Sequence, residues 1–187
     1  MKKIDQDLDR HTSHGLTVAF KGNRPFKCFT GSEDTKVNFF KGPPFQYEKV
    51  IDGAHNKFVN IIRCHPGNEF VISAGSDMTF VVYDATTGEI KQKKDKVHTG
   101  SIYSLAFFDS GKKFVTCSAD KTLKVWAFEG LELLHTLHVS AKPSVEDMQV
   151  GVTVTDQYLI SVSLSGIINY WNLSSLQGEV IAAPDFV

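Results

Sequence analysis

Four side chains in one stretch of the chain have the chemical types of a catalytic set. His98 supplies a base, Thr116 a hydroxyl, Asp120 a carboxylate and Trp126 a ring N–H. A histidine between a hydroxyl and a carboxylate is the arrangement that activates a nucleophile in many hydrolases. A catalytic set is needed only once in a protein, however, so recurrence of these residue types at a fixed spacing indicates a structural role instead.

The same residue types recur in four successive segments. Each segment has a tight-turn residue, at steps of 43, 43 and 45 residues: Asp34, Asp77, Asp120 and Ser165. Each segment also ends on an aromatic ring with the same spacing: Phe40, Tyr83, Trp126 and Trp171. A period near 43 residues is typical of β-propeller blades of the WD40 kind, with four strands per blade. The pattern therefore predicts an all-β fold of about four blades.

The recurring polar residues are expected to stabilise the blades. Two further sets accompany His98, Thr116, Asp120 and Trp126: His11, Thr30, Asp34 and Phe40, and His55, Ser73, Asp77 and Tyr83. The fourth segment keeps Ser161 and Trp171 but lacks the histidine and the acid. In WD-repeat proteins the corresponding residues form a buried hydrogen-bonded chain, from ring N–H to hydroxyl to histidine to turn acid. We expect the same chain here, without a ring donor at Phe40, and no catalytic residue.

The repeat pattern also divides the chain. Residues 1–10 are polar and are expected to be flexible, followed by four blades in residues 11–187 at about 11–52, 53–95, 96–140 and 141–187. In the last blade, strands are expected at 152–154, 157–161, 167–171 and 179–182. WD-repeat rings usually have about seven blades, so we expect an open arc of a larger propeller. Its two end blades would expose apolar faces, which favour self-association.

The composition argues against several classes of function. A net charge of −1 gives no reason to expect nucleic acid or an anionic membrane as partner. The first ten residues lack the apolar core of a secretion signal, and no apolar run approaches the roughly 20 residues of a membrane span. Cys28, Cys64 and Cys117 are far apart, and we interpret them as free, buried strand residues of a cytoplasmic protein. Clustered metal ligands and phosphate-binding loops are absent from the sequence, so we expect neither metal, cofactor nor enzymatic activity.

Three stretches resemble the actin-interacting protein 1 family. The first is Arg24-Pro25-Phe26 followed by FFKGPPFQY (residues 39–47), and the second is AHNKFVNIIRCHPGNEF (54–70). The third pairs VEDMQVG (145–151) with LISVSLSGIINYWN (159–172). The resemblance covers nearly the whole chain beyond the first ten residues, and it corresponds to inner blades of the family's first propeller only.

The resemblance carries expectations about function. Members of the family have two seven-bladed propellers joined like a clamshell, bind actin filaments and cofilin, and promote the disassembly of cofilin-decorated filaments. It therefore implies a cytoplasmic, cytoskeletal, non-enzymatic protein whose partners are actin filaments and cofilin. Two alternatives remain open at this point: a generic WD-repeat scaffold for another complex, and an incomplete, non-functional fragment.

Partner contacts are expected on loops at the faces of the propeller. Glu33 stands beside the turn residue Asp34, while Phe45 and Tyr47 follow a double proline. We expect these three residues to share one protein-binding surface; the alternatives are a solvated loop charge for Glu33 and strand packing for the two rings. The lysine-rich segment 91–96 is interpreted as a solvated outer strand whose charges discourage strand pairing, with an acidic partner surface as the alternative.

Overall fold

The computed structural model describes residues 10–140, 142–175 and 178–179, and these form four antiparallel sheets, called blades 1 to 4. Each blade has four strands, and strands that follow one another in sequence pair with one another. Blades 1 and 2 contain β1 (Gly15–Lys21), β2 (Lys27–Ser32), β3 (Val37–Lys41), β4 (Gln46–Ile51), β5 (Val59–Cys64), β6 (Phe70–Gly75), β7 (Phe80–Asp84) and β8 (Ile90–Lys94). Blades 3 and 4 contain β9 (Ile102–Phe108), β10 (Lys113–Ser118), β11 (Thr122–Ala127), β12 (Leu133–His138), β13 (Gln149–Val154), β14 (Tyr158–Ser163), β15 (Ile168–Asn172) and β16 (Gly178–Glu179).

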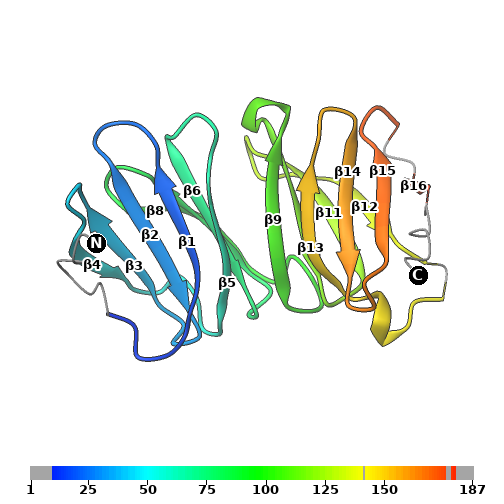
Figure 1. Ribbon diagram of the computed structural model, residues 1–187, viewed down its shortest axis with the longest axis horizontal. Helices are drawn as coiled ribbons and strands as arrows, with labels where there is room; N and C mark the ends of the chain where they lie inside the picture. The colour runs from blue at the N-terminus through cyan, green and yellow to red at the C-terminus, as the bar shows by residue number, and fades with distance from the viewer. Residues whose placement is uncertain (1–9, 141, 176–177, 180–187) are drawn as a thin grey trace, which may run out of the picture.

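The four blades stand side by side in a row, with blades 1 and 4 at its two ends (Figure 1). The first strands of successive blades, β1, β5, β9 and β13, lie next to one another. The sheets pack face to face because successive side chains of a strand point to opposite faces, so each inner blade presents apolar residues to both neighbours. The predicted all-β architecture, an open arc of four four-stranded blades, is confirmed.

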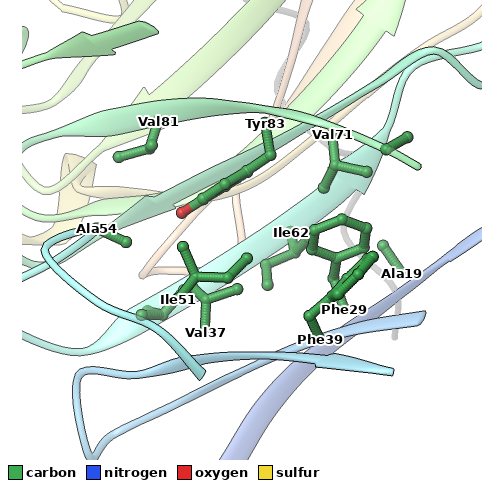
Figure 2. Packing of buried hydrophobic residues seen from close by; sticks show 12 residues of the cluster. Ala19, Phe29, Val37, Phe39, Ile51, Ala54, Ile62, Val71, Val81 and Tyr83 are labelled. Carbon is green, nitrogen blue, oxygen red and sulfur yellow. The ribbon is translucent and has the colours of Figure 1, made fainter. Parts of the chain in front are cut away.

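Three apolar clusters fill the spaces between the blades. Between blades 1 and 2, Phe29 and Phe39 pack toward Tyr83, and the ring centroids of Phe29 and Tyr83 are 5.9 Å apart (Figure 2). Between blades 2 and 3, Phe80 packs edge-on against Trp126 with 5.2 Å between ring centroids. A third cluster joins blades 3 and 4. The aromatic rings that end three of the repeats, at Tyr83, Trp126 and Trp171, therefore pack against the preceding blade.

One turn recurs between the second and third strands of each blade. The Asp34 carboxylate accepts a hydrogen bond from the Lys36 N–H at 2.9 Å, which holds the turn closed around the intervening residue. That residue has a left-handed backbone in all four blades: Thr35 (φ 72°), Met78 (φ 64°), Lys121 (φ 71°) and Gly166 (φ 85°). A left-handed backbone is energetically costly for residues other than glycine. In blades 1 to 3, where this residue is not glycine, the aspartate supplies local hydrogen bonds that stabilise the turn.

The first strand of blade 4 begins earlier than the sequence predicts. A 3-10 turn, η2 (Val145–Asp147), is capped by Ser144, whose N–H donates to the Asp147 carboxylate at 2.6 Å, and β13 then starts at Gln149 instead of residue 152. Gln149 and Gly151 interrupt the apolar pattern and so hide the start of this strand. The expected last strand overlaps β16, but residues 180–182 lie outside the described residues, as do residues 1–9 of the expected flexible segment.

Candidate functional site

In blade 3 the four predicted residues form one hydrogen-bonded chain. Trp126 Nε1–H donates to Thr116 Oγ1 at 3.0 Å, and Thr116 Oγ1 lies 2.7 Å from His98 Nε2. His98 Nδ1 lies 2.8 Å from Asp120 Oδ2. Because the carboxylate only accepts, the histidine donates from Nδ1 and accepts the threonine proton at Nε2. This order satisfies every polar group along the chain, whose hydroxyl and imidazole are buried.

The Asp120 carboxylate collects more donors than His98 alone. It accepts from the Thr99 N–H at 3.0 Å, the Thr122 N–H at 3.1 Å and the Thr122 hydroxyl at 2.6 Å. Burial by itself would raise the pKa of Asp120, but the hydrogen bonds from His98 and Thr122 outweigh it and hold that pKa well below its usual range. The carboxylate is therefore charged at neutral pH and fixed in position by its donors.

Blades 1 and 2 repeat this geometry with different rings. In blade 2 the Tyr83 hydroxyl lies 2.7 Å from Ser73 Oγ, which lies 2.6 Å from His55 Nε2. His55 Nδ1 is 3.0 Å from Asp77 Oδ2, and burial raises the pKa of Tyr83, so its phenol remains a donor. In blade 1 the corresponding set is partly exposed: His11 Nε2 lies 2.7 Å from Thr30 Oγ1 and His11 Nδ1 lies 2.9 Å from Asp34 Oδ2. Phe40 adds no donor to this set.

Blade 4 replaces the histidine with a residue that sequence reasoning missed. Ser161 Oγ donates to Gln149 Oε1, and the buried Asn169 donates to the same oxygen from Nδ2 at 3.4 Å. Gln149 Nε2 donates to the Asp147 carbonyl at 2.7 Å, so the amide is held at both ends. Gln149 is fully buried at the strand position that Ile102 occupies in blade 3, since they pair with Ser163 and Ser118 respectively. The one sequence signal for this role of Gln149 was a glutamine at the first position of a strand.

These sets are poor candidates for chemistry. Thr116 and Ser73 are completely buried, so no substrate atom can approach either hydroxyl. Each hydroxyl contacts a histidine and a ring within its own blade, and the geometry recurs in successive blades instead of gathering once around a cleft. Among the described residues, no group of three or more His, Cys, Asp or Glu is placed to hold a metal ion.

The three expected contact residues do not share a surface, so that expectation is wrong. Glu33 lies in the β2–β3 turn, where Ser13 Oγ donates to its carboxylate at 3.0 Å and His14 Nδ1 lies 2.8 Å from the same oxygen. Phe45 and Tyr47 lie beyond the end of β3, in the next turn and at the start of β4. Consecutive turns of an antiparallel sheet lie at opposite ends, which places Glu33 on one face of the arc and the two rings on the other.

The two rings belong to an aromatic patch at the end of blade 1. The ring of Phe45 lies 5.4 Å from that of Phe20, whose side chain is 54% exposed. Tyr47 is 37% exposed, packs edge-on against Phe40 at 5.8 Å, and has the Arg10 guanidinium 5.1 Å from its ring centroid. Phe20, Phe45 and Tyr47 are called the aromatic patch below.

The three cysteines are free thiols in strands. Cys28 and Cys117 are buried, and burial raises the pKa of the Cys28 thiol to about 11 and that of Cys117 to about 12. Cys64 is only half-buried, unlike the expectation, because it ends β5 next to an exposed turn. Raised pKa values keep these thiols protonated and unreactive at neutral pH.

No helix in the described part of the chain is long and apolar enough to span a membrane.

The repeat family described as "WD domain, G-beta repeat" matches residues 46–84 and 91–127, which include two of the recurring polar turns. The match ends at the last residues of β7 and β11, so each matched unit runs from the outer strand of one blade to the third strand of the next.

Longer proteins match most of the chain. It is 37% identical to actin-interacting protein 1 of Drosophila melanogaster over 156 residues, which are 83% of this chain and 25% of that protein. Actin-interacting protein 1 of Caenorhabditis elegans is 37% identical over 162 residues, with 83% of this chain and 26% of that protein covered. WD repeat-containing protein 1 of Rattus norvegicus is 37% identical over 167 residues, with 88% and 27% covered. The chain thus spans about a quarter of the length of these relatives. The chain carries WD repeats and is similar to one part of the longer proteins of the actin-interacting protein 1 family.

Proposed function

We propose that this chain is a non-enzymatic protein-interaction module that binds actin filaments and promotes their disassembly together with cofilin. The observation that carries the proposal is its 37% identity, over 83% of its residues, to a relative named for its interaction with actin. Cytoskeletal localisation follows from the same proposal. The chain covers 25% of that relative, and its own binding and disassembly activities are part of the proposal.

The enclosed polar sets support a binding role over an enzymatic one. A buried hydroxyl that already donates its proton to a histidine and accepts from a ring has no open approach for a substrate. The sets instead favour one conformation of each blade, because any other conformation would leave buried polar groups without hydrogen-bond partners. Interaction surfaces then remain on the turns and the exposed side chains around them.

The aromatic patch is the contact region we favour for a protein partner. Phe20 and Tyr47 are exposed large side chains, and aromatic residues with exposed rings are enriched where proteins bind one another. Glu33 belongs to a separate contact region on the opposite face. There its pKa is lowered by hydrogen bonds from His14 and Ser13, so the turn presents a charge that is already engaged by its neighbours.

Co-sedimentation with actin filaments tests the proposal. The chain should pellet with filaments in a saturable manner, and more of it should pellet when cofilin is present. Combined Phe45→Ala and Tyr47→Ala should weaken pelleting, whereas Tyr158→Ala, which also removes an exposed ring but in blade 4, should leave it unchanged. A folded chain that stays in the supernatant under all conditions would favour the generic WD-repeat scaffold.

The open end faces of blades 1 and 4 support a further proposal of self-association. Leu16, Val18 and Phe20 are 41–54% exposed on β1, and Tyr158 is 40% exposed on β14. Two arcs that joined through these faces would bury apolar surface now in contact with water. Sedimentation equilibrium should then show a concentration-dependent dimer, and a monomer throughout would contradict this proposal.

A further inference from the structure

The outer strand of blade 3 is an exposed sheet edge. β12 pairs with β11 alone in the described part of the chain, so its other edge carries unpaired backbone N–H and C=O groups. Five of its six residues are exposed, including Leu133 at 46% and Leu134 at 39%. Only Leu137 is buried, in the core shared with blade 4. An apolar strand that is anchored on one side and open on the other is a template for a further strand.

The other outer strands are protected by charge. β4 carries Glu48 and Lys49, and β8 carries Lys91, Lys93 and Lys94. Charged side chains along an edge, lysine above all, discourage pairing with another strand. β12 has the sequence LLHTLH, with no Lys, Arg, Asp or Glu. Of the three outer strands whose side chains the structure describes, it is the only one without such a residue.

A hollow lies where β12 begins. It has a volume of about 630 Å³, and its lining includes Glu132, directly before β12, together with His65, Gly111 and Phe128. The rings of His65 and Phe128 are 4.6 Å apart, and His65 Nε2 donates to the Gly111 carbonyl at 3.1 Å. These contacts join blade 2 to blade 3 and give the hollow an aromatic wall. Because Glu132 lines the hollow, the hollow adjoins the start of β12.

We propose that the free edge of β12 binds an extended segment of a partner protein by strand addition. The segment pairs its backbone with β12, carries no charged side chain where it faces the two leucines, and places one apolar side chain in the hollow. A second copy of this chain fits less well, because two six-residue strands paired edge to edge bury far less than the 1,200 Å² or more of a stable interface. A segment that also fills the hollow gains contact area that the symmetric pair lacks. This inference does not depend on actin binding.

A labelled peptide of sequence TVTVTVF, uncharged and prone to form strands, serves as the probe. Fluorescence anisotropy should show saturable binding to the full chain, and hydrogen exchange at residues 133–138 should slow in its presence. His135→Lys places a lysine on the exposed edge and should weaken binding by about tenfold or more. The control Gln92→Lys adds the same charge to β8 and should leave binding unchanged. Urea melts of both variants check that each remains folded.

Several outcomes would overturn the proposal. The peptide should lose binding when its central valine is replaced by proline, so equal binding of the proline peptide would exclude strand addition. Absence of saturable binding to the wild-type chain, or equal binding by the His135→Lys variant, would show that the edge is not the site. A wild-type dimer that His135→Lys abolishes would assign the edge to a second copy instead.

Discussion

Replacing Asp120 with alanine should destabilise the chain by about 1–3 kcal/mol, which is the cost of leaving one buried donor unpaired. The structure identifies that donor as His98 Nδ1–H, because the His98 side chain is completely buried and its Nδ1 lies 2.8 Å from Asp120. The other donors to this carboxylate come from Thr99 and Thr122, which reach the surface and can turn to water. They therefore add little to the expected loss.

Urea denaturation followed by tryptophan fluorescence measures this loss, since the two tryptophans are Trp126, within the set, and Trp171, in blade 4. The matched control is Asp156→Ala, which removes an exposed aspartate and should change the unfolding free energy by no more than about 0.5 kcal/mol. Asp120→Asn keeps an acceptor oxygen and should lie between the two. If Asp120→Ala unfolded at the same urea concentration as Asp156→Ala, with an unchanged slope, the structural role assigned to the set would be refuted.

Three further predictions concern stability. The pKa values of Asp34, Asp77 and Asp120 are lowered in the fold; burial opposes the change, and hydrogen bonds outweigh it. Their contribution to the unfolding free energy should thus be complete above the unfolded pKa of about 3.9, and it should be lost as the pH falls from there through the lower pKa values of the folded state. Urea midpoints at pH 7, 4 and 3 measure this loss, and equal midpoints would contradict it. Gln149→Leu leaves Ser161 and Asn169 without their shared acceptor and should cost about 1–3 kcal/mol, against little change for the exposed Gln157→Leu. Gly111→Ala should lower the melting temperature more than Gly53→Ala. Both glycines have positive φ, but only the new Cβ at Gly111 would lie 2.2 Å from His65 Nε2. Equal shifts in melting temperature would argue against this close contact.

The fold was predictable because its determinants recur in sequence. An aspartate followed by a left-handed residue closes the same turn in blades 1 to 3, and in blades 2 and 3 the ring six positions later packs on the preceding blade. Gln149 was missed because it reaches Ser161 from within a strand, 12 positions away, instead of from the loop position of the histidines. The expected common surface for Glu33, Phe45 and Tyr47 failed because proximity in sequence hides the alternation of turns between opposite ends of a sheet. The uncharged edge of β12 is visible only when the outer strands are compared with one another.

Release of actin subunits from filaments tests the central claim most directly. Filaments would be incubated with cofilin, with and without this chain, and the actin left in the supernatant after centrifugation would be measured. The proposed function predicts that the chain raises supernatant actin in proportion to its concentration when cofilin is present and has little effect without cofilin. Supernatant actin that is the same with and without a folded chain, at every cofilin concentration, would contradict it.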